Sequence, residues 1–229
     1  METLVTLKVS VVLSSIMTAF DTGTRIKKKA HELFMQFGLR SVSMDDIANS
    51  LGMSKKTIYQ YYADKDELTV EVIQEEIQRT QAICDRDRKL SSNAINEVFL
   101  AMDMVVEIFG TMNPSLLFDM QKFHPRAYQK FQNHKNDYLF NVFRNNIQRG
   151  IREELYRPQI KADVLSMYRL ETLMLPFHPD FQNKLKYNLA DLQEEFIIHF
   201  LYGMATLKGY KLIQKYQQDR KKIINDPTK

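Results

Sequence analysis

Two adjacent lysines, a threonine and three tyrosines lie close together in the stretch IANSLGMSKKTIYQYYADKDEL, from Ile47 to Leu68. Ammonium and phenol groups donate hydrogen bonds to phosphate oxygens, and lysine side chains also reach the edges of bases. What these groups can do together depends on which of them share one face of a helix.

Helix caps and stops divide this stretch into short elements. Ser43, followed three residues later by Asp46, matches a capping box, and Gly52 supplies the left-handed residue that ends a helix. Two further caps follow at Ser54 and Asp64. The pattern predicts two short helices joined by a tight glycine-containing turn, which is a helix-turn-helix, and then a longer helix.

One face of the second short helix is expected to point away from the core. Ile58 and Tyr62 lie one turn apart and can both face inward. Tyr59 and Tyr61 flank the outward face, where hydroxyls reach phosphate oxygens, and Lys65 adds positive potential. The residues expected on the outward face itself are Lys55, Lys56, Thr57 and Gln60. Such a face fits the major groove of a DNA duplex.

A further helix is predicted before this pair. Apolar residues recur at helical spacing from Thr22 to Phe37, and Gly38 provides the stop. Its first turns carry a basic cluster, at the end where the helix dipole disfavours cations. Two interpretations of the cluster stay open, a solvated face or a set of phosphate contacts. Its members are Arg25, Lys27, Lys28 and Lys29.

Composition favours an all-α protein. The chain has 229 residues, of which 44% are hydrophobic and 26% charged, and only seven glycines and six prolines are available for turns. The single cysteine, Cys84, excludes an intrachain disulfide framework and suggests a reducing compartment, the cytoplasm. A formal net charge of +4 is too mild to identify a partner.

Residues 1–21 are expected to form a loosely ordered extension. Alternating residues from Val5 to Val11 are typical of a short strand, which would have no partner in a helical chain. Lys8 and the serines interrupt the apolar stretch, so neither a secretion signal nor a membrane span is expected. Translation that starts naturally at Met17 would explain the segment, and residues 1–16 would then not belong to the native protein.

A larger helical bundle is predicted to follow the amino-terminal domain of residues 22–68, and it occupies residues 69–229. The expected helices cover Lys65 to about Asp87, 95–109, 115–123, Arg126 to Arg149 with Gly150 as its stop, Ile160 to Met174, and Leu189 to Leu207, followed by a basic tail from Lys208 to Lys222.

The quoted motifs resemble a known family. The phrases SVSMDDIA, LGMSKKTIY and YYADKDEL, with Arg25 and the Leu33–Phe34 and Phe37–Gly38 pairs before them, are similar to the amino-terminal domain of TetR/AcrR-type bacterial transcriptional regulators. More weakly, NPSLLFDMQKFHP, GIREELYR and HFLYGMATLKG also resemble a branch of that family. The chain departs from many relatives at Lys56, where a small residue or proline is common, so its base preference is open.

The resemblance implies specific contacts and a function. Arg25 is implied to contact the phosphate backbone of the DNA. The other residues for which DNA contact is implied are Ser43, Lys55, Lys56, Thr57, Tyr59, Tyr61 and Lys65. It also implies a carboxy-terminal domain that binds a small inducer and forms a homodimer. The expected protein is a dimeric repressor of a palindromic operator that a small molecule releases. An activator of the same fold and a helical protein-interaction adaptor are the alternatives.

Two further sets of residues are predicted in the bundle. Two half-sites need a symmetric pair of subunits, so a dimer interface is expected at Val164, Tyr168, Phe196, Phe200, Gly203 and Leu207, although an ordinary core stripe fits the same spacing. A cavity for a nonpolar or amphipathic molecule is expected to be lined by Phe99, Met102, Phe118, Phe123, Phe140, Phe143 and Met167. The acids considered as partners of a cationic ligand are Glu107, Asp119 and Glu171.

Catalysis is not expected. Cys84 has no histidine near it in the sequence, and the five histidines show no metal-binding spacing. No phosphate-binding glycine loop or serine elbow is present either. We therefore expect no enzyme activity, no metal and no cofactor.

Overall fold

The computed structural model describes residues 21–225, and within them the chain is helical without a β-strand. The first helix covers residues 21–37. The others are α2 (Met44–Leu51), α3 (Lys55–Tyr59), α4 (Lys65–Leu90), α5 (Ala94–Thr111), α6 (Leu116–Phe123), α7 (Pro125–Asn133), a π-helical turn (His134–Leu139), α8 (Phe140–Arg152), α9 (Ala162–Met174), a 3₁₀ turn (Leu175–Phe177), α10 (Pro179–Lys184), α11 (Leu189–Met204) and α12 (Leu207–Asn225). The all-α prediction is confirmed.

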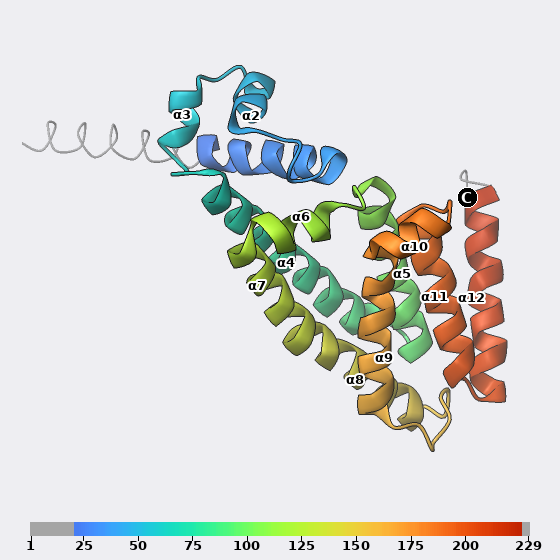
Figure 1. Cartoon of the computed structure of the whole chain (residues 1–229). Coiled ribbons are helices and arrows are strands. Elements are labelled where there is room, and N and C mark those ends of the chain that lie inside the picture. The colour runs from blue at the N-terminus through green and yellow to red at the C-terminus, as the bar shows by residue number, and fades with distance from the viewer. Residues whose placement is uncertain (1–20, 226–229) are drawn as a thin grey trace, which may run out of the picture.

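The first helix, α2 and α3 form an amino-terminal domain at one end of the molecule (Figure 1). Its predicted caps are confirmed. Ser43 and Asp46 make a complete capping box on α2, and Gly52 ends that helix with φ 65°. The side chains of Ser54 and Asp64 cap α3 and α4. These local hydrogen bonds satisfy the free amides at each helix start and therefore determine where the short helices begin.

The core of this domain extends into the rest of the chain. Ile26, Ile47 and Ile58, one from each of the first three helices, are completely buried. They belong to one apolar cluster with residues of α4, α6 and α7, including Met120 and Ala127. Because α4 runs without a break from this cluster into the bundle, the two parts of the chain share a continuous helix (Figure 1). The cluster itself spans both parts, since α6 and α7 contribute to it.

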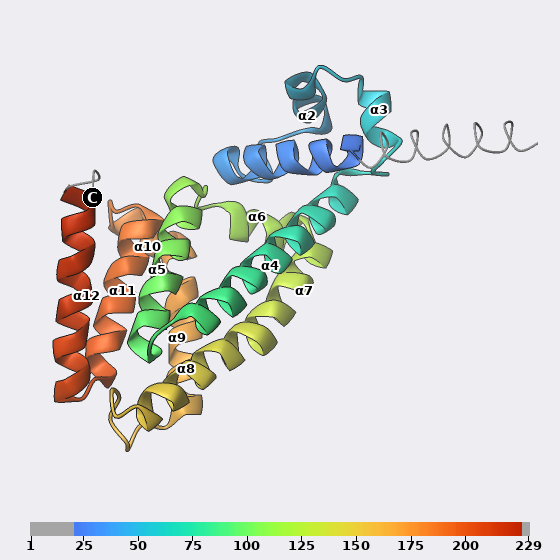
Figure 2. The same ribbon diagram turned by 180° about the vertical axis from the view of Figure 1, so that it is seen from behind.

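A second apolar cluster holds the bundle together. It joins α5, α8, α11 and α12 around Ile95, Ile147, Leu201 and Ile213, all of which are buried. In both views α12 is the outermost helix and lies beside α11 (Figures 1 and 2). This arrangement leaves α4, α7 and α9 on the other side of α5 and α11.

The predicted basic tail is wrong, since this part of the chain forms α12. Ile213 is completely buried, and the Phe99 and Tyr216 rings pack with centroids 5.3 Å apart. Arg220 forms an ion pair with Asp103 of α5. The apolar positions Leu212, Ile213 and Tyr216 follow helical spacing, but the lysines between them mask it.

The helix predicted from Arg126 to Arg149 also differs from the structure. The helix expected to end at Gly150 continues to Arg152, and a π-helical turn interrupts it at His134–Leu139. Gly150 lies inside the helix and under the ring of Tyr156, where a Cβ atom would be 2.0 Å from Cδ2. The glycine therefore makes room for this ring and does not end the helix. The chain turns afterwards at Glu154, which has φ 61°.

The predicted extension, including the strand from Val5 to Val11 and the start at Met17, lies outside the described residues apart from residue 21. Within residues 21–225, none of the helices combines the length and apolar character needed to cross a lipid bilayer.

Candidate nucleic-acid interface and internal cavity

The helix α3 presents a polar face to solvent. Ile58 is completely buried beneath it, and Tyr62 beside it donates a hydrogen bond to the Gly23 carbonyl at 3.1 Å. The side chains of Lys56, Tyr59 and Gln60 are exposed, as predicted from the helical spacing. Lys56 has no ion-pair partner among residues 21–225, so its ammonium is available to an external anion.

Lys55 is also exposed but has an internal partner. Its Nζ lies 2.9 Å from Asp45 Oδ2 of α2, and 6.0 Å from the centroid of the Tyr59 ring. The hydrogen bond and charge of Asp45 raise the pKa of Lys55. The pair connects the two helices of the helix-turn-helix and places a carboxylate next to the predicted contact surface.

Four of the predicted contact residues have structural partners. Ser43 Oγ donates to Asp46 Oδ2 at 2.6 Å, and Thr57 Oγ1 lies 2.8 Å from Ser54 Oγ within the α3 cap. The other two are half-buried. Tyr61 packs against Gly23 of the first helix, and Lys65 donates to the Leu39 carbonyl beside the Phe34 ring, with a pKa lowered by burial.

The basic cluster of the first helix divides into two groups. Lys27 pairs with Glu75 of α4 at 2.6 Å, and Lys29 pairs with Glu32. Arg25 and Lys28 are exposed and have no ion-pair partner within the described part of the chain. Lys27 therefore helps to hold the first helix on α4, whereas Arg25 and Lys28 remain available to phosphates.

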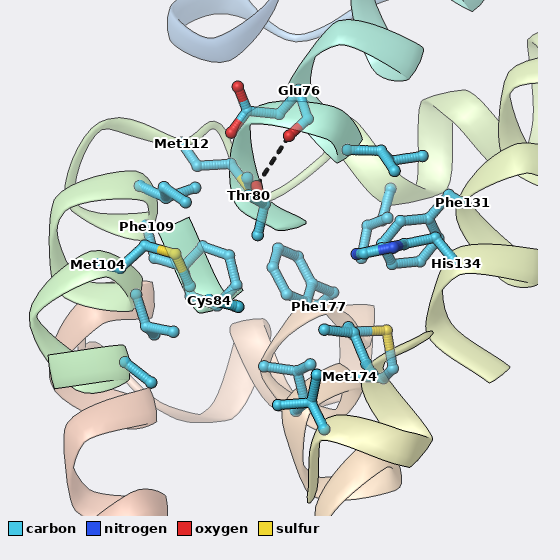
Figure 3. A pocket seen from close by; sticks show the side chains of 18 of the residues that line it. Glu76, Thr80, Cys84, Met104, Phe109, Met112, Phe131, His134, Met174 and Phe177 are labelled. Atoms are coloured by element: carbon cyan, nitrogen blue, oxygen red, sulfur yellow. Dashed lines mark hydrogen bonds between the residues drawn. The ribbon is translucent and has the colours of Figure 1, made fainter. Parts of the chain in front are cut away.

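A cavity of about 230 Å³ lies between the two apolar clusters, and both contribute to its wall. Figure 3 shows labelled side chains around it, with Glu76, Thr80 and Cys84 from α4 along one wall. Met104 and Phe109 of α5 also line it with Met174 and Phe177, and the Phe109 and Phe177 rings pack edge to face with centroids 5.3 Å apart (Figure 3). The first helix also contributes to the wall, through His31, Phe34 and Met35.

Most of the predicted ligand residues do not line this cavity. Of the seven, only Phe143 does so. Phe99 and Met102 are buried in the second apolar cluster, where they pack against other helices. Phe140 is partly buried but absent from the wall, and the remaining three are exposed, Phe118, Phe123 and Met167. Aromatic residues and methionines at helical spacing indicate a buried face, but the spacing alone does not identify which faces enclose a space.

The acids considered for a cationic ligand are also elsewhere. Asp119 is buried, but it accepts hydrogen bonds from the Arg40 amide at 3.0 Å and from Ser115. Glu107 and Glu171 are exposed. The carboxylates that do line the cavity are Glu76, Asp87 and Glu97.

Each cavity carboxylate has a cationic partner. Glu76 lies 2.8 Å from Arg79 and 3.2 Å from His31. Asp87 pairs with Arg86 at 2.8 Å, and Glu97 with Arg149 at 2.9 Å. Burial alone would raise the pKa of Glu76, but the bonds from His31 and Arg79 outweigh it and hold the pKa at about 2. Burial raises the pKa of Glu97 despite its partner, and that of the Cys84 thiol to about 11.

The predicted interface residues include an exposed apolar strip on α9. Val164 and Tyr168 are 60% and 49% exposed, and Met167 between them is 51% exposed. The Tyr168 ring stacks on Phe200 of α11 with centroids 6.1 Å apart. Gly203 and Leu207 are exposed farther along the chain, whereas Phe196 is partly buried against Phe181 of α10.

Comparison with known proteins agrees with this architecture. The family described as "Bacterial regulatory proteins, tetR family" matches residues 26–72, which cover most of the first helix, α2, α3 and the start of α4. This match places the likeness to the tetR family in the amino-terminal domain. An uncharacterised HTH-type transcriptional regulator of Bacillus subtilis, YvaF, is 32% identical over 106 residues, or 45% of this chain. The chain spans about half of that relative's length, 55%.

Solved structures extend the tetR-family likeness over the bundle, where it concerns the fold. A tetR-family transcriptional regulator from Agrobacterium tumefaciens superposes with a TM-score of 0.69 at 14% identity, over 82% of this chain and 100% of that one. A transcriptional regulator from Saccharomonospora viridis in complex with choline has a TM-score of 0.63 at 15% identity, over 81% and 98%. The bundle therefore has the fold of tetR-family structures.

Proposed function

We propose that this protein is a ligand-responsive transcriptional regulator of the cytoplasm, a homodimer that represses from a palindromic DNA operator and is released by a small molecule. The observation that carries the proposal is the exposed face of α3, where Lys56, Tyr59 and Gln60 stand above a buried Ile58. Lysine and glutamine read base edges and tyrosine reaches phosphates, so the face is suited to a major groove.

Contacts to the DNA backbone complete this surface. Arg25 and Lys28 on the first helix are free to neutralise phosphates, which position the duplex without reading its sequence. Lys55 can join them if it exchanges Asp45 for a phosphate. Ser43, Thr57, Tyr61 and Lys65, which have partners within the domain, act mainly by shaping this surface.

Dimerisation uses the exposed strip on α9. Three large apolar side chains in succession on a surface helix, Val164, Met167 and Tyr168, are typical of a subunit interface. Phe200 and the exposed Gly203 and Leu207 continue the surface onto α11 and the start of α12. A two-fold pairing through this surface would give two copies of α3 for the two half-sites of a palindrome.

Release by a ligand follows from the position of the cavity. His31, Phe34 and Met35 of the first helix and seven residues along α4 share its wall, so a bound molecule contacts the amino-terminal domain directly. A ligand that favours a different position of the first helix on α4 shifts the spacing of the two recognition helices. By linkage, DNA then weakens ligand binding by the same factor.

Recovery of bound genomic fragments tests the proposal. The purified protein is incubated with fragmented genomic DNA of its source organism, and the retained fragments are sequenced. We expect enrichment of an inverted repeat, with Lys56→Ala weakening its binding by about 1–3 kcal/mol. Lys211→Ala on the exposed side of α12 is the matched control and leaves affinity unchanged.

Two results would argue against the proposal. Retention of fragments without a shared motif would show that the protein does not recognise a specific operator. Equal DNA affinity of the Lys56→Ala and Lys211→Ala variants would show that Lys56 of α3 does not contact the DNA. A promoter fused to the recovered motif then distinguishes repression from activation by the sign of its response.

A further inference from the structure

The strongest remaining feature is a buried cation in the wall of the cavity. Arg169 of α9 is 5% exposed and lines the same space as Phe143, Met174 and Phe177. Its guanidinium lies 5.5 Å from the centroid of the Phe143 ring. Its one hydrogen bond to another side chain within residues 21–225 is a long one, 3.5 Å, to Thr172 Oγ1.

Among the residues that the structure describes, this guanidinium has no counter-charge. Each of the three carboxylates of the cavity is paired with another arginine, Glu76 with Arg79, Asp87 with Arg86, and Glu97 with Arg149. No acidic side chain of the described chain lies within ion-pair distance of Arg169. Burial lowers the pKa of Arg169 to about 10, which still leaves it charged at neutral pH.

An isolated buried cation is costly, and a protein normally pairs it. A guanidinium has five N–H donors in a planar fork that matches a carboxylate with two parallel hydrogen bonds. A ligand carboxylate would supply the missing negative charge. It would also accept hydrogen bonds from the Arg169 N–H groups that have no acceptor within the described chain. Beyond Arg169 the wall is mainly apolar, with Leu173, Ile197 and Phe200 nearby in the lining.

We propose that the cavity binds an anionic amphipath, a small molecule with a carboxylate or similar acidic head and an apolar body, and that Arg169 binds its head. This inference deepens the proposed function and rests on it for its regulatory meaning. A cationic ligand is disfavoured, because every acid in the wall already has a cation and Arg169 would repel another. The volume of about 230 Å³ is below that of most drug-sized pockets, so the body is short.

Calorimetry with three probes of equal chain length tests the charge of the head group. Octanoate, octanol and octylammonium are titrated separately into the full-length protein without DNA, and octyl sulfate is added to distinguish a carboxylate from other anions. We expect octanoate to bind at least about tenfold more tightly than octanol, as a charge-assisted pair requires, and octylammonium to bind more weakly still. Equal affinity for octanoate and octanol, or preference for octylammonium, would overturn the proposal.

Variants test the residue. Arg169→Met keeps an unbranched stem but removes the guanidinium and its charge, and we expect it to weaken octanoate binding by about tenfold or more while octanol is unaffected. Arg152→Met, at the exposed end of α8, is the matched control and keeps the octanoate affinity. Unchanged octanoate binding by a folded Arg169→Met protein would refute the role of Arg169.

Thermal unfolding gives an independent readout. Since the ligand-free wild type contains an uncompensated buried charge, Arg169→Met should unfold at the same temperature or higher, whereas octanoate should stabilise only the wild type. A lower unfolding temperature without ligand would contradict the absence of a counter-charge. If Arg169→Met does not fold, the probe series on the wild type and Arg169→Lys, which keeps the charge, still decides the question.

The two proposals fail separately. Genomic fragments recovered by a protein that shows no preference for octanoate would refute the anionic ligand and leave the regulator. Octanoate binding that depends on Arg169, in a protein that retains no DNA motif, would support the ligand and refute the regulator.

Discussion

His31 Nε2 lies 3.2 Å from Glu76 Oε2, and this contact joins the first helix to α4 at the wall of the cavity. Arg79 donates to both oxygens of the same carboxylate, from Nη2 to Oε1 at 2.8 Å and from Nε to Oε2 at 3.0 Å. Glu76 is therefore the point at which the amino-terminal domain, the long helix and the cavity meet. A molecule that displaces this carboxylate would alter how the first helix sits on α4.

The pH dependence of stability should report this contact. The pKa of Glu76 is about 2 in the folded protein against an ordinary value of 4.5. A lowered folded pKa stabilises the protein above the unfolded value, and this contribution is lost as the pH falls from about 4.5 towards 2. We expect Glu76→Gln to reduce the free energy of unfolding by up to about 3 kcal/mol near pH 6, with the difference closing towards pH 2.

Urea unfolding of the wild type and Glu76→Gln across this pH range makes the measurement. Glu71→Gln, an exposed change on the same helix, is the control and should follow the wild type at every pH. A Glu76→Gln difference that stays constant with pH would show that the charge of Glu76 is not involved.

Asp45 should weaken DNA binding. Its carboxylate lies 2.9 Å from the Lys55 ammonium. It therefore holds Lys55 in an ion pair that competes with DNA phosphates, and its own charge repels those phosphates. Asp45→Asn is expected to tighten binding of a recovered fragment by roughly threefold at low salt, and the gain should shrink as salt rises. Fluorescence anisotropy with Asp137→Asn as the charge-matched control checks this, and equal affinities of the two variants would count against the role of Lys55.

The subunit interface can be tested through Tyr168. A glutamate there would bury a charge in the proposed apolar contact, and we expect Tyr168→Glu to weaken dimerisation by about thirtyfold or more. Light scattering coupled to size exclusion measures the mass of the particle. Tyr187→Glu, at another exposed tyrosine, should leave it unchanged. A Tyr168→Glu protein that remains dimeric would show that the subunit interface does not include this part of α9.

Gly150 should not tolerate a side chain. A Cβ atom there would lie 2.0 Å from the Tyr156 ring, which is itself completely buried and has little room to move. Gly150→Ala is expected to destabilise the protein by about 1–3 kcal/mol or more. Gly110→Ala in α5 meets nothing within 4 Å, so it should be neutral or stabilise by up to about 1 kcal/mol. Chemical denaturation compares the two, and equal effects would contradict the close packing at Gly150.

The helices of the amino-terminal domain could be predicted from the sequence because the residues that define them act locally. The capping box of Ser43 and Asp46, the left-handed Gly52 and the spacing of Ile58 and Tyr62 act over a few residues, and the structure has each of them as predicted. The outward direction of Lys56 follows from the same periodicity. The apolar pattern of α12 was equally local, but its lysines concealed it.

The cavity was decided by the tertiary structure. Its wall takes residues from the first helix, α4, α5, α8, α9 and α11, and which side chains enclose a space depends on how those helices cross. Helical periodicity separates a buried face from an exposed one, but it does not distinguish a packed core from a cavity, so Phe99 and Met102 were predicted as lining while Glu76 and Arg169 were not. The sequence determines which side chains are present, and only the packing of distant helices determines that Arg169 is buried without an ion-pair partner among residues 21–225.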